Sequence, residues 1–357
     1  MLRNPPNETD MTKGRLVTTS KQTAPFGRAA AALCVAALLC AASSADAETV
    51  KIGVAKSTTA APVYVAVAKG FFAAEGIDPQ VVFFEAAQPV AVAVVSGDID
   101  VGVTGFTGGF YALAGQGALK IIGAHSREVP GFHGLGYFVS EKAAAAGLKT
   151  VKDIPGHSVA FTTVGSAFHY SLALAAEKYG FDMQTVHLEP LQSNPNAASA
   201  VAGGSVDIAM VPSTSGLPVV QRGQAKVLAW VGDETTWQLG ATFISAKTAD
   251  TRGDMVKRFM NAYRKGARLY HDAVTGPDEL PKNGPQTAEM IAIIAKAIGQ
   301  TDAEVSTALA YADPDERVDV KDILHQIAWY RAQGMVKGEF NPEDMIDKRY
   351  MIPYPQK

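Results

Sequence analysis

The sequence predicts an α/β fold of two lobes, each built on a mostly parallel sheet flanked by helices. Short apolar strands alternate with helical segments from residue 49 to residue 245, which is typical of parallel sheets covered by helices. The alternation restarts after Pro155-Gly156. A helix end, a glycine, an aspartate and an apolar strand follow one another twice, at residues 93–103 and 200–211. Two related lobes explain these observations.

Residues 1–47 are predicted to be a signal peptide. Basic residues precede an apolar run at 29–40, and Ala45-Asp46-Ala47 fits the small-x-small pattern of signal-peptidase sites. About 12 apolar residues are too few for a membrane span, which needs roughly 20. Two alternatives stay open, a start at Met11 and lipidation at Cys40. We expect a protein that is exported to the periplasm.

Composition excludes several classes of function. Both cysteines, Cys34 and Cys40, lie in the predicted signal peptide, so residues 48–357 offer no thiol for catalysis, zinc binding or a disulfide. Removing the five basic and three acidic residues of the signal peptide from the 32 and 35 of the whole chain leaves a net charge of −5. A mildly acidic chain lacks the basic footprint of nucleic-acid binding, and we expect no such partner.

The first part of lobe one is predicted to span residues 48–138. It begins with a strand at 49–55, and Pro62 and Pro89 stand where proline favours the start of a helix. Glycines at 76 and 97 end these helices. The remaining elements expected here are strands at 80–84, 98–103, 119–124 and 136–140 and a helix at 107–115.

Lobe two is predicted to span residues 139–240, and residues 241–357 return to lobe one. The elements expected in lobe two are strands at 158–161, 185–188, 206–211 and 225–230 and helices at 166–179, 195–202 and 217–222. A strand at 240–245 carries the chain back, so that two segments cross between the lobes. Helices then follow at 252–272, 286–299, 302–311 and 320–333, with apolar residues at helical spacing.

The segment Gly165-Ser166 is the first candidate for a ligand site. It forms a glycine turn between a strand and a helix start, where unpaired N–H groups and partial positive charge favour a small anion. The alternative is that Ser166 only caps a buried helix, a role that serine often fills. Ligands of parallel sheets bind beyond the carboxyl ends of strands. The hydroxyl-rich segments 104–107 and 213–215 are therefore expected to face each other across a cleft.

Catalytic and metal-binding patterns are missing from the sequence. No two histidines are three or four residues apart, as zinc-binding helices need; they are His125, His133, His157, His169, His187, His271 and His325. The sequence has no Gly-x-Ser-x-Gly elbow, P-loop or dinucleotide fingerprint. We expect neither an enzyme nor a metal or cofactor site.

Four motifs in order carry a resemblance to a known family. They are Lys69-Gly-Phe-Phe-Ala-Ala-Glu-Gly-Ile77, Ser96-Gly-Asp-Ile-Asp-Val-Gly102, Gly165-Ser-Ala-Phe-His-Tyr170 and Gly204-Ser-Val-Asp207. Over roughly residues 49–245 the chain resembles ABC-importer solute-binding proteins of the nitrate, sulfonate and taurine type, which include binders of thiamine-pyrimidine precursors. The resemblance implies a type II periplasmic-binding-protein fold with the ligand between the lobes, a monomer, and an inner-membrane permease as partner.

The resemblance also implies positions for the ligand. It places Gly165, Ser166, Ala167 and His169 at an anion, with Ser57, Thr58, Thr59, Thr104 and Gly105 as further candidates. The sequence departs from many sulfonate binders at Val211-Pro-Ser-Thr-Ser215, where those carry an aromatic-acidic-proline segment, so Ser213 and Thr214 are candidates for a different ligand. Candidate packing groups are Phe106, Phe132, Trp230 and Trp237. Arg127 is a candidate partner for a carboxylate or sulfonate, and the alternative is a solvated arginine.

The leading hypothesis is a solute-binding protein that captures a small organic anion, a sulfonate or a carboxylate, aromatic ones included. Nitrate is the least expected anion, because four aromatic residues near the cleft suit a larger ligand. A neutral thiamine-pyrimidine precursor is the alternative ligand. An enzyme of the pyrimidine-synthase type is disfavoured because those relatives carry a cysteine-rich motif that residues 48–357 lack. Delivery to a membrane sensor is a third possibility.

Overall fold

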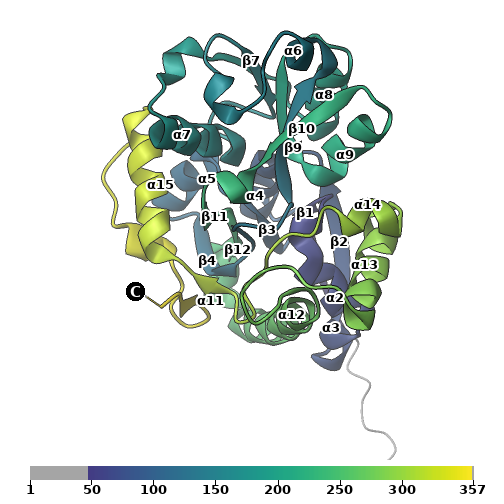
Figure 1. Ribbon diagram of the computed structural model, residues 1–357. Helices are drawn as coiled ribbons and strands as arrows, with labels where there is room; N and C mark the ends of the chain where they lie inside the picture. Colours follow the sequence, from purple (N-terminus) through teal and green to yellow (C-terminus); the bar gives the residue numbers. More distant parts are fainter. Residues whose placement is uncertain (1–46, 356–357) are drawn as a thin grey trace, which may run out of the picture. The chain divides into compact units, whose positions relative to one another are not determined.

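The computed structural model describes residues 47–355. The predicted signal peptide, with Met11 and Cys40, lies outside the described residues except for its last position. The described residues belong to one unit, Asp46–Lys357, which holds two five-stranded sheets. In each sheet four of the five strands run in the same direction, since the pairing is antiparallel only around β12 in one sheet and around β6 in the other. The predicted α/β class is confirmed (Figure 1).

The first sheet has the strand order β2-β1-β3-β12-β4. Its strands are β1 (Glu48–Ala55), β2 (Ile77–Phe84), β3 (Val101–Gly105), β4 (Leu119–Ala124) and β12 (Gly240–Ser245). The helical segments between them are η1 (Thr58–Ala60), α2 (Ala61–Ala68), α3 (Phe71–Ala74), α4 (Ala87–Ser96) and α5 (Gly108–Gly115). As predicted, strand 240–245 returns to this sheet, where it pairs with β3 and β4.

The second sheet has the strand order β10-β6-β9-β7-β8. Its strands are β6 (Leu135–Ser140), β7 (Ser158–Phe161), β8 (His187–Pro190), β9 (Ile208–Pro212) and β10 (Ala225–Trp230). The helical segments around it are α6 (Glu141–Ala145), η2 (Val151–Asp153), α7 (Ala167–Tyr179), η3 (Met183–Thr185), α8 (Asn194–Ala202), α9 (Ser213–Gln221) and α10 (Val231–Glu234).

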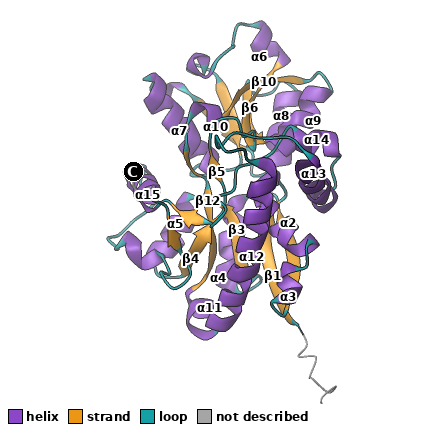
Figure 2. Cartoon of the chain, turned by 60° about the horizontal axis from the view of Figure 1, so that its bottom comes forward, coloured by secondary structure: helices purple, strands orange, loops and turns teal. Residues whose placement is uncertain are grey.

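The two sheets are joined by a short ribbon. Strand β5 (Arg127–Glu128) pairs antiparallel with β11 (Trp237–Gln238), and each lies in a segment that crosses from one sheet to the other (Figure 2). All of β6 belongs to the second sheet. The predicted boundary between the lobes, between residues 138 and 139, falls inside this strand. The reason is that β6 forms ladders with both β9 and β10, so its hydrogen bonds bind it to the second sheet from Leu135 onward.

The C-terminal part adds helices that cover the first sheet and reach the second. They are α11 (Ala246–Thr251), α12 (Gly253–Val274), α13 (Pro285–Ile298), α14 (Asp302–Ser306), α15 (Val320–Ala332) and η4 (Pro342–Met345), with a two-stranded sheet of β13 (Arg317–Val318) and β14 (Ile352–Pro353). The predicted helix 302–311 already ends at Ser306. On α15, Tyr330 Oη donates to the carbonyl of Ser166 at 3.3 Å, which ties this helix to the start of α7.

Among the described residues, no helix combines the length and apolar character that a membrane crossing requires.

Candidate functional site

A cavity of about 50 Å³ lies where the carboxyl ends of the parallel strands of the two sheets meet. From the side of the first sheet it is lined by Ala55, Ser57, Thr59, Ala87, Thr104, Gly105, His125 and Leu239. From the side of the second sheet it is lined by Leu135, Thr162, Ser166, Ala167, Phe168, Asn194 and Pro212. Both sheets therefore contribute to one cavity, at the edge where ligands of α/β proteins bind.

Loops of the two halves touch beside this cavity. The Gly108 N–H donates to the Gly165 carbonyl at 2.8 Å, and the Asn194 N–H donates to the Glu85 carbonyl at 3.3 Å. Gln300 Nε2 donates to the Thr214 carbonyl at 2.6 Å. These contacts join the two halves of the molecule near the cavity.

The hydroxyl groups of the cavity wall retain hydrogen atoms for a ligand. Ser57 Oγ and Thr59 Oγ1 lie 2.6 Å apart, so one hydroxyl donates to the other and the acceptor of the pair keeps its own hydrogen. Ser166 Oγ accepts the His169 N–H at 3.4 Å, which makes it the N-cap of α7. Because a hydroxyl that accepts still has a hydrogen to donate, Ser166 both caps the helix and offers a donor to the cavity.

The turn before α7 is fixed by Gly165. This residue has φ +82°, a conformation that favours glycine, and a Cβ added there would lie 2.8 Å from Met335 Sδ. Its N–H donates to His169 Nδ1 at 3.1 Å. Gly165 therefore shapes the turn that presents Ser166 and Ala167 but does not itself line the cavity.

Six of the predicted ligand residues line the cavity: Ser57, Thr59, Thr104, Gly105, Ser166 and Ala167. Besides Gly165, three more lie close by with other roles. Thr58 Oγ1 donates to the Ala308 carbonyl at 2.5 Å. Phe106 packs in the core, with its ring centroid 5.0 Å from that of Tyr111. His169 stacks on Phe161, and burial lowers its pKa to about 4, so it acts as a neutral acceptor for the Gly165 N–H.

Ser213, Thr214 and the four aromatic candidates lie outside the cavity wall. Ser213 and Thr214 form the first turn of α9 rather than a loop, and their hydroxyls are buried without a hydrogen-bond partner. Trp230 stacks on His133 with 4.4 Å between the ring centroids. Of the other aromatic candidates, Phe132 packs on Tyr311 and Trp237 on Tyr170. None of the four aromatic candidates lines the cavity, so the argument they supplied against nitrate has no basis; Phe168 is the aromatic residue that does.

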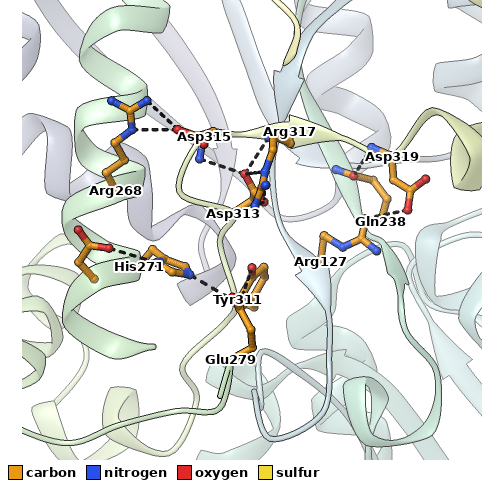
Figure 3. A network of polar contacts seen from close by, with 11 residues as sticks. Arg127, Gln238, Arg268, His271, Glu279, Tyr311, Asp313, Asp315, Arg317 and Asp319 are labelled. Atoms are coloured by element: carbon orange, nitrogen blue, oxygen red, sulfur yellow. Dashed lines mark hydrogen bonds and ion pairs between the residues drawn. The ribbon is translucent and has the colours of Figure 1, made fainter. Parts of the chain in front are cut away.

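Arg127 belongs to the connecting ribbon instead of the cavity. Its Nη1 lies 3.0 Å from Asp319 Oδ2, and its guanidinium lies 4.6 Å from the ring centroid of Tyr354. Figure 3 shows this side chain turned toward Asp319, whose N–H donates to Gln238 Oε1 at 3.1 Å. The pair braces the ribbon β5–β11 against the start of α15.

We predict that Arg127→Met lowers stability without weakening ligand binding. The arginine side chain is 9% exposed and that of Asp319 is 19% exposed. The expected loss of unfolding free energy is therefore about 1–2 kcal/mol, between the values for surface and for buried ion pairs. Urea unfolding measures this loss, and anion titration of the folded variant measures affinity. A tenfold weaker affinity would instead assign Arg127 to the ligand.

His125, Thr162 and Asn194 are cavity residues that the sequence analysis did not select. His125 and Thr162 directly follow β4 and β7, so the rule that ligands bind beyond the carboxyl ends of strands points to both. Asn194 opens α8, and its Oδ1 is buried without a partner. No charged side chain belongs to the cavity wall, and burial lowers the pKa of His125 to about 3.

Comparisons with known proteins agree with this architecture. No curated protein sequence matches the chain. The alkanesulfonate-binding protein SsuA from Xanthomonas axonopodis pv. citri, bound to MOPS, is 22% identical, with 85% of this chain and 99% of that chain covered and a TM-score of 0.65. The nitrate-binding protein NrtA from Synechocystis PCC 6803 is 17% identical, with 72% and 69% covered and a TM-score of 0.55. The desulfurization enzyme DSZB is 13% identical, with 86% and 96% covered and a TM-score of 0.59.

These likenesses confirm the predicted periplasmic-binding-protein fold, and at such identities they extend to the fold alone. The match to a family model is the stronger finding. The model described as NMT1/THI5 like matches residues 57–279, which is more than half of the chain and includes the segments around Ser57, Thr104 and Ser166. The protein therefore belongs to the NMT1/THI5-like family.

Proposed function

We propose that this protein is the solute-binding component of an ABC importer and captures a small oxoanion in the cavity. The observation that carries the proposal is the cavity wall, which combines hydroxyl groups from both sheets with the start of the 13-residue helix α7. Hydroxyl hydrogens and the first N–H groups of a helix are suited to a negatively charged oxygen. The sulfonate- and nitrate-binding proteins of the same fold support an anion as ligand.

The volume favours a small ligand. A single water needs about 10–15 Å³, so a cavity of about 50 Å³ corresponds to a few waters. Nitrate, methanesulfonate and acetate are of this size, whereas aromatic carboxylates and pyrimidines need more space. We therefore narrow the proposal to anions with at most a short aliphatic group.

The available interactions reach a useful affinity. A hydrogen bond to a charged group contributes about 1.5–3 kcal/mol, and a helix N-terminus contributes about 0.3–2 kcal/mol. Micromolar binding needs about 8 kcal/mol. Three hydroxyl donors at about 2 kcal/mol each, together with about 2 kcal/mol from the start of α7, come to this amount. The wall has such donors, since Ser57 with Thr59, Thr104 and Ser166 belong to it.

Delivery of the ligand requires that the lobes open and close. The ribbon β5–β11 provides a hinge with few backbone hydrogen bonds, and the contact between Gly108 and Gly165 forms only when the loops meet. A ligand that touches both lobes stabilises the closed state by its differential affinity. We propose an inner-membrane permease as the partner that receives the ligand, and a monomeric binding protein in the periplasm.

A binding role is favoured over a catalytic one. Catalysis by a hydroxyl nucleophile needs a base within hydrogen-bond reach, and both ring nitrogens of His125 lack a hydrogen-bond partner. Neither Ser166 nor Thr104 is therefore paired with the one imidazole in the wall.

A thermal-shift screen of residues 48–357 tests the proposal. The panel contains nitrate, methanesulfonate, ethanesulfonate, acetate, benzoate and a hydroxymethylpyrimidine. A ligand present at a hundredfold excess over its Kd adds about 2.7 kcal/mol to the free energy of unfolding, a readily measured shift. We expect the small anions to raise the melting temperature and benzoate to have no effect. A shift with the pyrimidine alone would replace the anion by a neutral ligand.

A further inference from the structure

His125 stands in the cavity wall with no group to bond to. It directly follows β4, and its backbone N–H donates to the Gly240 carbonyl at 3.3 Å. His125 is one of the residues that line the cavity, it is 2% exposed, and its buried Nδ1 and Nε2 both lack a hydrogen-bond partner. Buried polar groups are nearly always paired. An imidazole left unpaired in a cavity wall therefore points to a ligand that pairs with it.

His125 differs from the other residues of the cavity wall because it is the one that is able to carry a charge. The fifteen lining residues include no aspartate, glutamate, lysine or arginine, and His125 is the one lining residue that titrates between pH 3 and pH 10. An oxoanion in this cavity is otherwise surrounded by neutral donors. A buried charge without a counter-charge is costly, and a protonated imidazole is the counter-charge that the wall is able to supply.

The neighbours of His125 do not hold it in the charged form. Arg127 and Glu128 are the next charged residues on its own segment, and Tyr263, Tyr311, Asp313 and Glu316 lie on segments that are hydrogen-bonded next to it. Arg127 is paired with Asp319, and Asp313 with Arg317. Burial alone lowers the pKa of His125, to about 3, so in the empty cavity the imidazole is neutral.

Resting on the proposed function, we propose that His125 contacts the bound oxoanion and takes up a proton from solvent as the anion binds. The physical reason is that an anion within about 4–6 Å favours the charged form of a titratable group, here the imidazolium. Nothing else is exchanged, since the proton comes from the buffer and the anion enters unchanged. The complex then holds an ion pair where the empty cavity holds a neutral ring.

This proton uptake determines how the affinity for the anion depends on pH. The pKa of His125 is higher in the complex than in the empty protein, so affinity rises as the pH falls between these two pKa values. Above the pKa of the complex, affinity does not depend on pH. Nitrate and methanesulfonate are anions of strong acids and stay ionised from pH 5 to pH 7.5, so a pH dependence of their binding comes from the protein.

The test measures the Kd of nitrate and of methanesulfonate by calorimetry at pH 7.5, 6.0 and 5.0. The buffers are bis-tris and piperazine chloride, because sulfonate and carboxylate buffers are themselves potential ligands. We expect at least a fivefold tighter Kd at pH 5.0 than at pH 7.5. His125→Gln, which keeps an N–H donor but cannot be protonated, is expected to bind more weakly and without pH dependence. His157→Gln is the matched control, because His157 precedes β7 whereas the cavity residue Thr162 follows that strand. We expect this variant to keep the affinity and the pH dependence of the wild type.

A second readout needs no variant. In protein labelled with ¹⁵N-histidine, the ring nitrogen shifts of His125 at pH 5.0 are expected to change from those of a neutral ring to those of an imidazolium when nitrate is added. A neutral ring in the complex overturns the proposal even if His125→Gln weakens binding. Equal affinity of His125→Gln and wild type overturns it as well. If neither anion binds the wild-type protein at any pH, the proposed function itself fails, and that result is distinct from binding without proton uptake.

Discussion

Replacing Ser166 by alanine is expected to weaken oxoanion binding about ten- to a hundredfold. The hydroxyl lies in the cavity wall and keeps a hydrogen to donate, because its oxygen already accepts the His169 N–H. A hydrogen bond to a charged group contributes about 1.5–3 kcal/mol, which corresponds to this loss. The same change removes the N-cap of α7 and lowers the free energy of unfolding by about 1 kcal/mol. Calorimetric titration and urea unfolding measure the two effects separately.

Ser193→Ala is the matched control for this variant. Ser193 caps α8 in the same way, with its Oγ accepting the Asn196 N–H at 3.2 Å, but it does not line the cavity. We expect a similar loss of stability with unchanged affinity. If both variants bind as tightly as the wild type, Ser166 is a capping residue only and the anion site lies elsewhere.

Gly240→Ala is expected to destabilise the fold by about 3 kcal/mol and to disturb the cavity with it. Gly240 opens β12 and pairs with Gly105 in β3. A Cβ on Gly240 would lie 2.0 Å from the Thr104 carbonyl oxygen and 2.6 Å from Gly105 Cα, and both are backbone atoms that cannot rotate away. The two strands have to separate, which costs more than ordinary overpacking of side chains. Since Thr104 and Gly105 line the cavity, the affinity for anions falls as well.

Gly203→Ala serves as the control for the added methyl group. A Cβ there meets no atom closer than 3.5 Å, and the residue has φ −80°, which alanine adopts without strain. We expect its unfolding free energy to stay within about 0.5 kcal/mol of the wild type, as for most substitutions without a structural conflict. A Gly240→Ala protein that is equally stable would contradict the close approach of β3 and β12.

The cavity also revises the expected ligand. The sequence predicts aromatic packing groups and therefore a larger anion. Phe106 and Trp237 are buried in the core instead, at 1% exposure each, and the wall consists of small hydroxyl and aliphatic residues with His125, Phe168 and Asn194. A ligand of the size of nitrate or methanesulfonate fits this wall better than an aromatic acid. On the proposed function, neutral donors with one titratable imidazole would hold the anion without arginine or lysine.

Most elements of the fold follow from local signals. The strand at 240–245 was predicted with its observed bounds, because a short apolar run between turns is a local property. Glycine and serine likewise determine the turn at Gly165 and the start of α7 through φ +82° and a side-chain cap. The sequence was less informative about which sheet a strand joins, because that depends on pairing with distant strands. Strand β6 joins the second sheet because it forms ladders with β9 and β10, and even its nearest pair in the chain, Val139 with Ile208, is 69 residues apart.

The sequence by itself therefore determined the α/β class, the return strand, the presence of Ser57 and Thr104 at strand ends and that of Ser166 at a helix start. Only the tertiary structure decided which residues line the cavity. Arg127 and His125 are two residues apart, yet Arg127 pairs with Asp319 in the connecting ribbon and His125 lines the cavity. The position of the Arg127 side chain depends on α15, almost 200 residues later in the chain, which brings the carboxylate of Asp319 to the arginine. Local sequence contains no information on such a distant partner, because the contact forms only when the whole chain has folded.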